Sequence, residues 1–332
     1  MPSSEAWCEE MNRRQFLCAL GGLAVAWPLA ARTQEAGRTH RLGVLLPHPR
    51  DVPVNLAFLD EFRRRGFIEG QNLAVEWRAY WQHFDLISQY AAELVKARVD
   101  VIVAGGDEAI RALQQATKTI PIVALTDDML GSGFVNSVAR PDGNTTGVNI
   151  LGREGDGKRQ DILIEALPRL RRMAALVDVT TDPRLDALKE GAHAHNIELS
   201  IYRIARVEEI VAAIDMAQAS GATALNVLSS ALFWGNRQLI RDRVAALHLP
   251  AIYPFPEEAE EGGFAAYGPR LDDLFLEVMP RQIVELFRGI KVGDIPIEQP
   301  TRFELVINLK TAKALGLTIA ESFLVRADKV IE

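Results

Sequence analysis

Residues 100–125, DVIVAGGDEAIRALQQATKTIPIVAL, hold the pattern that decides the fold. The stretch opens with a run of branched apolar residues at 100–104 and closes with a second such run at 120–125, both typical of strands buried on two faces. Between them, residues 108–117 predict a helix. A strand, a helix and a strand at this spacing predict a right-handed crossover between parallel strands of one sheet.

The same alternation extends outward from this stretch in both directions. It begins at the apolar run of residues 41–46 and restarts after the turn-rich residues 140–147. It then continues to the helix predicted over 271–288. Each of the two series has the size of an ordinary domain. The sequence therefore predicts an α/β protein with two doubly wound, mainly parallel lobes.

In open parallel sheets, ligands bind outside the carboxyl ends of the strands. If the two lobes face each other across a hinge, the turns at these ends border a single cleft. The turns that this rule selects are residues 47–53, 80–84, 105–108 and 126–133 in the first lobe, and residues 178–183, 229–235 and 254–257 in the second.

The N-terminal residues 1–34 predict export. Arg13 and Arg14 precede an apolar run that is too short to span a bilayer and is typical of a signal peptide. The run RRQFL resembles a twin-arginine signal, so we expect a protein of the periplasm, with Met11 as an alternative start. The other interpretation, an amphipathic N-terminal helix, lacks an acidic face to balance the apolar run.

Composition excludes several classes of function. Cys8 and Cys18 both lie in the leader, so the remaining chain has no disulfide, cysteine nucleophile or cysteine ligand. The leader has equal numbers of acidic and basic residues, so the rest keeps the net charge of −7. This charge argues against nucleic acid or an anionic membrane as a partner. No later apolar run has the length of a membrane span, so we do not expect an integral membrane protein.

Motifs for covalent chemistry are missing from the sequence. His193 and His195 are two residues apart and point to different sides of a helix, and the other histidines have no ligand-like spacing. Neither a G-x-S-x-G elbow nor a phosphate-binding G-x-x-x-x-G-K-[ST] loop occurs. We therefore expect no enzyme activity, cofactor or metal. An exported α/β enzyme would need a nucleophile or metal cluster that the sequence does not present.

Several motifs together resemble one family. They are GSGFV at 131–135, ARPDGNTTG at 139–147, LPAIY at 249–253, YGP at 267–269 and QPTRFELVINLKTAKALGL at 299–317. These resemble the substrate-binding proteins of ABC-type importers, in the branch that includes tryptophan- and tyrosine-binding members. The resemblance extends from the leader to Glu332.

The resemblance implies a type I periplasmic binding-protein fold, in which two lobes joined by three crossovers close on a ligand. The crossovers would fall near residues 147–151, 263–268 and 289–296. The implied lobes are residues 38–148 plus 266–290 for lobe one, and residues 149–265 plus 291–332 for lobe two.

The function that the resemblance implies is the capture of a small organic ligand, aromatic or amino-acid-like, between the lobes. The protein would then deliver this ligand to the permease and ATPase of an ABC importer. The alternative with the same fold is a periplasmic ligand-sensing subunit for a signalling receptor. The sequence does not separate these two functions.

Departures from the family pattern gather at the expected pocket. Relatives commonly carry a Gly-Thr-Pro-Ala-like turn where this chain has GGDEA at 105–109. They often read Ser-Asp-Pro-Val where it has TDDML at 126–130, and Asn-Pro where it has DVTTD at 178–182. We therefore expect an orthodox scaffold with an unusual pocket.

Four carboxylates, those of Asp107, Glu108, Asp127 and Asp128, are predicted at the rim of the first lobe. One or two of them would pair with an ammonium group of the ligand. Asp107 also has the position of an N-cap before the helix that starts at Glu108, which is the alternative role. Asp127 is the better candidate for a ligand contact, because the family usually keeps an aspartate near this position.

Aromatic and basic residues complete the predicted site. Tyr80 or Trp81 against Trp234 would sandwich a flat ligand, with plain packing between the lobes as the alternative. His48 and Arg50 would hold a ligand carboxylate, with exposed loop charges as the alternative. The complete predicted set lies in or beside the strand-end turns: His48, Arg50, Tyr80, Trp81, Gly106, Asp107, Glu108, Thr126, Asp127, Asp128, Asp178, Thr180, Ser229, Ser230, Trp234, Tyr253, Pro254 and Tyr267.

Overall fold

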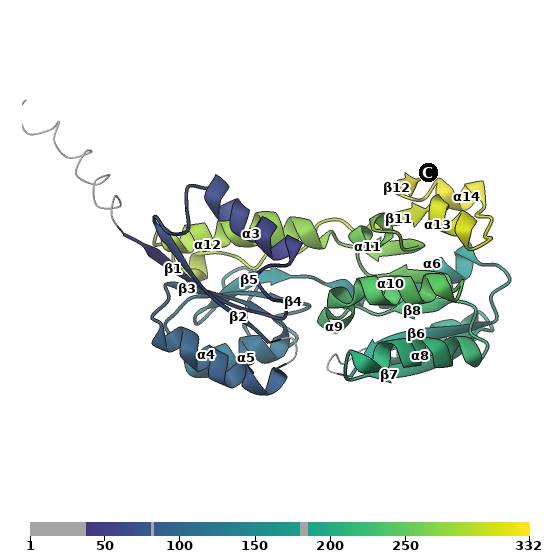
Figure 1. Cartoon of the computed structure of the whole chain (residues 1–332), viewed down its shortest axis with the longest axis horizontal. Coiled ribbons are helices and arrows are strands. Elements are labelled where there is room, and N and C mark those ends of the chain that lie inside the picture. Colours follow the sequence, from purple (N-terminus) through teal and green to yellow (C-terminus); the bar gives the residue numbers. More distant parts are fainter. Residues whose placement is uncertain (1–37, 81–82, 180–184) are drawn as a thin grey trace, which may run out of the picture.

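The computed structural model describes residues 38–80, 83–179 and 185–332 and has two α/β lobes, each built on one sheet (Figure 1). The predicted leader lies outside the described residues. The first sheet has five parallel strands in the order β2-β1-β3-β4-β5. Its strands are β1 (His40–Leu46), β2 (Leu73–Ala79), β3 (Val101–Gly105), β4 (Ile122–Thr126) and β5 (Thr145–Asn149).

Helices cover both faces of the first sheet. Figure 1 places α3 and α12 on one face and α4 and α5 on the other. Because the central strands are shielded on both sides, every residue of β3 is buried, as its apolar sequence predicts. The helical elements of this lobe are α3 (Pro53–Arg64), η1 (Phe84–Leu86), α4 (Ile87–Lys96), α5 (Asp107–Ala116), η3 (Asp273–Val278), α12 (Met279–Phe287) and η4 (Val292–Asp294).

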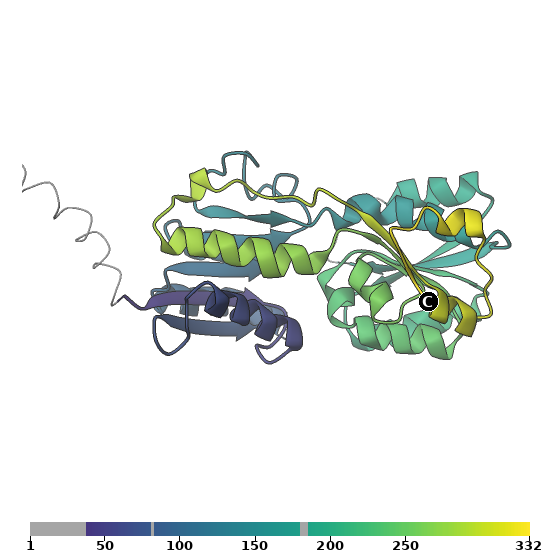
Figure 2. The same cartoon turned by 90° about the horizontal axis from the view of Figure 1, so that it is seen from above.

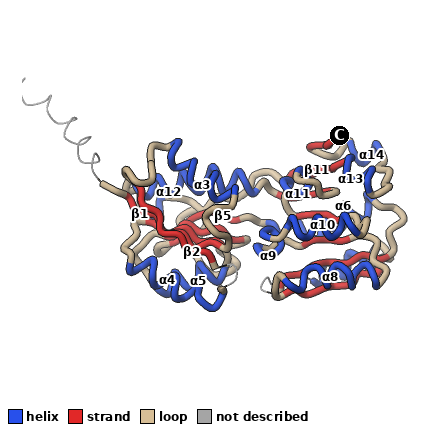
Figure 3. The backbone as a smooth tube through the Cα atoms, in the orientation of Figure 1, coloured by secondary structure: helices blue, strands red, loops and turns tan. Residues whose placement is uncertain are grey.

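The second sheet has seven strands in the order β12-β11-β10-β9-β8-β6-β7. Its neighbours are parallel except for β10 and β11, which run antiparallel. Figure 3 shows the two sheets in red as separate bodies, one in each lobe. The strands are β6 (Arg172–Asp178), β7 (Glu198–Ile204), β8 (Leu225–Val227), β9 (Ala251–Tyr253), β10 (Ala265–Gly268), β11 (Glu304–Asn308) and β12 (Lys329–Ile331).

Two groups of helices enclose this second sheet. One apolar core lies against α8, α10 and α11, and another against α6, α7, α13 and α14. Among the described residues, no helix combines the length and the apolar character that a membrane crossing requires. The helical elements are η2 (Gly152–Gly155), α6 (Asp156–Ala166), α7 (Leu185–Ala194), α8 (Glu208–Ala219), α9 (Ala231–Gly235), α10 (Arg237–Ala246), α11 (Pro256–Glu260), α13 (Leu309–Ala314) and α14 (Glu321–Leu324).

The chain passes between the lobes three times, and two crossings lie later than the sequence suggested. Residues 265–268 form β10 of the second sheet, so the second crossing follows Gly268. Ile295 and Ile297 pack in the cores of the first lobe, and Glu298 bridges to β5. The third crossing therefore follows Glu298. The expected lobe boundaries are corrected accordingly, because the apolar side chains after α12 still serve the first sheet.

One glycine of the first sheet permits a close backbone approach. At Gly147 in β5, φ is +137°, and a Cβ atom there would lie 2.0 Å from the carbonyl oxygen of Ala124 in β4. No side chain fits that space. The glycine thus permits β5 to pair with β4 just before the chain first leaves the lobe.

Candidate ligand-binding site

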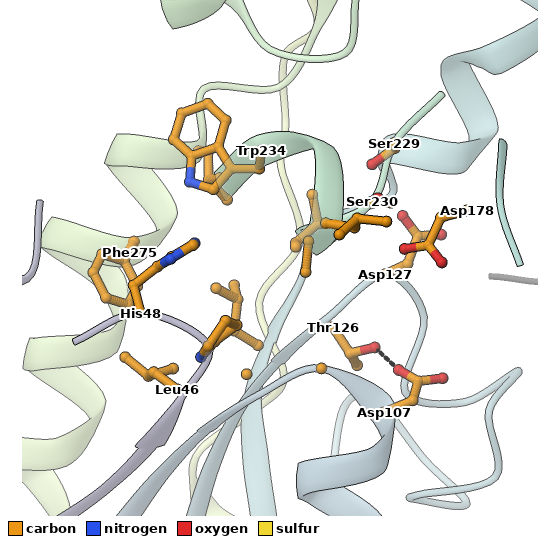
Figure 4. Close-up of a pocket in the computed structure, with 18 of the residues that line it drawn as sticks. Leu46, His48, Asp107, Thr126, Asp127, Asp178, Ser229, Ser230, Trp234 and Phe275 are labelled. Atoms are coloured by element: carbon orange, nitrogen blue, oxygen red, sulfur yellow. Dashed lines mark hydrogen bonds between the residues drawn. The ribbon is translucent and has the colours of Figure 1, made fainter. Parts of the chain in front are cut away.

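A cavity of about 200 Å³ lies between the two lobes, at the carboxyl ends of their strands. All seven turns selected by the strand-end rule contribute at least one lining residue, so that prediction is confirmed. The two ends of the cavity differ in chemistry. Figure 4 shows Asp107, Asp127 and Asp178 on one side, and Trp234, His48 and Phe275 on the other.

The acidic end, defined here as Asp107, Glu108, Asp127 and Asp178, draws on both lobes. Asp107 lies in the first turn of α5, where its carboxylate accepts hydrogen bonds from the hydroxyls of Thr126 and of Ser132, the latter at 2.9 Å. Gly106 is the N-cap of α5, and no side chain caps it. The N-cap role predicted for Asp107 is therefore wrong.

Glu108 stands at the rim of this end, where three carboxylates come close. Partial burial raises the pKa of Glu108, and the charges of Asp107 and Asp178 raise this pKa further. Asp178 ends strand β6 of the second lobe, whereas Glu108 follows β3 of the first. Like charges from the two lobes thus face each other across the cavity.

Asp127 is paired within the protein. The Nε atom of Arg153 donates to its Oδ2 at 2.7 Å, and the backbone nitrogen of Arg153 donates to its Oδ1 at 3.0 Å. Arg153 lies in η2, directly after the first crossing, so this ion pair joins the two lobes. Arg153 was not predicted from the sequence, because the strand-end rule does not select a turn beyond a crossing.

The aromatic end, defined as Trp234, Phe255, Phe275 and His48, is held by packing. The rings of Trp234 and Phe255 meet edge to face at 5.2 Å between centroids, and Phe275 stacks on Phe58 at 4.6 Å. Burial, and then the charge of Arg237, lowers the pKa of His48 to about 4, so this imidazole is neutral near pH 7. Phe255 lies in a turn that the strand-end rule selected but was not itself predicted, and Phe275, from the helix after the second crossing, was not predicted at all.

Behind the cavity, a buried ion pair fixes the entry to the second lobe. Asp156 and Arg159 pair with each other, and Arg159 is fully buried. Its guanidinium donates to the carbonyl of Gly152 at 2.8 Å and to that of Tyr267 at 2.9 Å. These carbonyls flank the first and second crossings. Asp156 also accepts from the backbone nitrogen of Ser229, so the network reaches the cavity wall.

The structure brings most of the predicted site residues together. Those that line the cavity are His48, Tyr80, Gly106, Asp107, Glu108, Thr126, Asp127, Asp178, Ser229, Ser230 and Trp234. Trp81 and Thr180 lie outside the described residues. Tyr80 is buried in the first lobe, packs edge to face against Phe84 and donates its hydroxyl to the carbonyl of Gly105.

Five of the predicted site residues lie elsewhere than on the cavity wall. Arg50 forms an ion pair with Glu69 on the surface, where both side chains remain accessible. Asp128 accepts hydrogen bonds from the backbone nitrogens of Leu130 and Gly131 and so closes its own turn.

The other three pack within the second lobe, where Tyr253 and Pro254 are buried and Tyr267 is partly buried. Tyr253 belongs to one of its apolar cores. Pro254 is buried, and its carbonyl lies against Gly268. Tyr267 packs against the ring of Phe303. None of these five residues is part of the cavity wall.

Comparisons with known proteins agree with this architecture. Residues 44–331 match the family described as ABC transporter substrate binding protein. A protein of Clostridioides difficile (strain R20291) described as a tyrosine-binding protein is 23% identical over 278 residues, covering 82% of this chain and 79% of that protein.

Solved structures with the same fold include two of similar overall likeness. A conserved domain protein of Vibrio cholerae superposes with a TM-score of 0.75 at 22% identity, and the match covers 88% of this chain and 100% of that one. An ABC domain from Streptococcus pneumonia, in complex with L-Trp, gives a TM-score of 0.74 with the same identity and coverage. The fold is of the type I periplasmic binding-protein kind. The chain belongs to the family of ABC transporter substrate-binding proteins.

Proposed function

We propose that this protein captures a small amphipathic organic molecule with an aromatic ring between its lobes and delivers it to an ABC importer outside the cytoplasmic membrane. The observation that carries this proposal is the cavity, whose wall combines strand ends of both sheets with an aromatic end and a polar end. The names of the tyrosine-binding relative and of the L-Trp complex support an aromatic ligand.

Closure of the lobes would couple capture to delivery. A ligand that contacts both lobes favours the closed state only through its higher affinity for that state. The three crossings and the Asp127–Arg153 ion pair lie between the lobes, where such a rotation would be absorbed. The permease would then recognise the closed form by the rims of both lobes.

A ligand screen tests the capture. The protein is heated with amino acids, aromatic acids, aromatic amines, purines, polyamines and sugars, and the melting temperature is recorded. A ligand at 100 times its Kd adds about 2.7 kcal/mol to the free energy of unfolding, which moves the melting temperature by several degrees. A saturable shift with aromatic compounds is expected. The absence of a shift across the whole panel would overturn the proposal.

An uptake assay tests delivery. Cells that lack this protein should lose import of the ligand found in the screen, and the restored gene should recover it. Normal import without the protein would remove the transport role and favour the sensing role. We also propose that residues 1–34 direct export by the twin-arginine route. Replacing Arg13 and Arg14 by lysine should then leave the protein in the cytoplasm, and unchanged export would contradict this route.

A further inference from the structure

We propose that the ligand of this cavity is an organic cation, an amine or ammonium group on an aromatic body, that carries no carboxylate. The inference rests on the function proposed above and names the class of its ligand. It would set this chain apart from relatives named for tyrosine and L-Trp, which are amino acids with both charges.

The charge of the cavity wall is the first argument. Among the described residues, five carboxylate side chains and one guanidinium line the cavity. His48 adds no charge near pH 7, because burial holds its pKa at about 4. The carboxylates are those of Asp107, Glu108, Asp127, Asp178 and Asp272. A wall with this excess of negative charge attracts cations and repels anions.

The guanidinium on this wall, that of Arg153, is already paired with a carboxylate. Arg153 holds Asp127 through its Nε atom at 2.7 Å and its backbone nitrogen at 3.0 Å. A ligand carboxylate would have to displace Asp127 from this contact and leave that carboxylate uncompensated. Within the described part of the wall, no other arginine or lysine is available to a carboxylate.

The arrangement of charge on the two lobes is the third argument. Glu108 follows β3 of the first lobe and Asp178 ends β6 of the second, and the charge of Asp178 contributes to the raised pKa of Glu108. Closure without a ligand therefore brings like charges together. A cation between them removes this repulsion, so it binds the closed form more tightly than the open form.

The side chain of Ser229 adds a further polar group to the cavity wall. Ser229 follows β8, lines the cavity and is only 7% exposed. Its backbone nitrogen donates to Asp156, whereas its hydroxyl has no hydrogen bond to any described residue. Figure 4 shows Ser229 on the same side of the cavity as Asp178. An ammonium group between them would find a carboxylate and a hydroxyl acceptor, and the ring would extend toward Trp234.

Three compounds with one ring system test the inference by titration calorimetry at pH 7.5. Tryptamine has only the amine, tryptophan has both groups, and indole-3-acetate has only the carboxylate. We expect tryptamine to bind at least tenfold more tightly than tryptophan, and indole-3-acetate to bind most weakly. Tyramine, tyrosine and 4-hydroxyphenylacetate repeat the comparison on a smaller ring.

Tighter binding of tryptophan or of an arylacetate than of the matching amine would overturn the inference and leave the proposed function standing. Binding of a sugar or another non-aromatic neutral molecule from the wider screen, with no amine bound, would overturn both the inference and the aromatic class of ligand in the proposed function, and would leave only capture and delivery of a small molecule. Failure of the entire screen would overturn both.

Two variants locate the charge that selects the amine. Glu108→Gln and Asp178→Asn should each weaken tryptamine binding about tenfold and change indole-3-acetate binding little or in the opposite direction. Asp161→Asn, on an exposed part of α6, is the matched control and should change neither. An equal loss for all three indoles, at an unchanged melting temperature, would show that the two carboxylates only shape the wall and would overturn the inference.

Discussion

The two ends of the cavity are held in place by different forces. At the aromatic end, rings pack on rings, as Trp234 does on Phe255 and Phe275 on Phe58. At the acidic end, Asp107 depends on hydroxyl donors and Asp127 on the guanidinium of Arg153. Apolar packing responds little to pH or salt, whereas charge pairing responds to both. The aromatic end should therefore set the strength of binding, and the acidic end should set selectivity.

The largest expected effect is on the pH dependence of folding stability. Glu258 lies behind the aromatic end, is fully buried and accepts a hydrogen bond from the backbone nitrogen of Phe255. Burial raises its pKa to about 8. Because this pKa lies above the unfolded value, the folded state holds the proton more tightly. The free energy of unfolding that the protonated Glu258 contributes is therefore lost as pH rises from the pKa of this residue in the unfolded chain through about 8.

Glu258→Gln keeps an acceptor for Phe255 and removes the ionisation. The variant should be more stable than the wild type at pH 8 by about 4 kcal/mol and close to it at pH 4.5. Urea unfolding at both pH values measures the difference, with the exposed Glu190→Gln as control. The same dependence of stability on pH in variant and wild type would contradict this assignment.

Removing the main ring of the aromatic end should cost the most affinity. Trp234→Ala deletes a large apolar surface and the edge-to-face contact with Phe255. We expect a loss of about 100-fold in affinity for any aromatic ligand, which corresponds to about 2.7 kcal/mol. Calorimetry with tryptamine measures it. Phe303→Ala, outside the cavity wall and packed against Tyr267, should leave affinity unchanged. Unchanged affinity in Trp234→Ala would show that the aromatic ring of the ligand does not bind against Trp234.

Changing the charge of the acidic end should alter selectivity more than strength. Arg153→Gln leaves the carboxylate of Asp127 without its guanidinium. Tryptamine should then bind about tenfold more tightly, and indole-3-acetate should bind more weakly, because about 1.4 kcal/mol corresponds to a factor of ten. Arg140→Gln, on an exposed turn, serves as the control. If the two ligands changed in the same direction, Arg153 would be acting through the shape of the site.

The smallest effect is expected outside both ends. Arg50 and Glu69 form an exposed ion pair, and such pairs typically contribute about 0.5 kcal/mol to stability. Arg50→Ala should therefore change ligand affinity by less than twofold and the melting temperature by about a degree. A larger loss of affinity would restore Arg50 to the site and weaken the division into two ends.

Sequence patterns predicted the lobes well because each strand and helix carries its own periodicity. The strand-end rule also located the cavity, since topology alone fixes which turns meet. The strand-end rule did not reveal which charged side chains already have ion-pair partners within the protein. Asp127 and Arg153 come from different lobes, and Arg50 finds its partner Glu69 across the surface. Pairing of this kind depends on three-dimensional placement that no local pattern encodes.

The lobe boundaries show a similar limit. Residues 291–298 are rich in glycine and proline and resemble a connector. Ile295 and Ile297 nonetheless pack in the cores of the first lobe. A local pattern of two apolar residues does not predict this packing. Phe275 was missed for a related reason. Its position in the cavity follows from how the helix after Gly268 lies on the first sheet, and the turns of the sheet do not specify it.

The late position of α12 has a consequence for biogenesis. Figure 2 shows this helix, in yellow-green, lying along the first lobe, whose five strands are complete by Asn149. Met279 and Ile283 of α12 are fully buried against that sheet. During synthesis, more than a hundred further residues must be made before α12 can cover this apolar face of the first sheet. A nascent or truncated chain ending near residue 150 would expose that face, so it should aggregate or require a chaperone. The first lobe is thus the first part to be made and among the last to be finished.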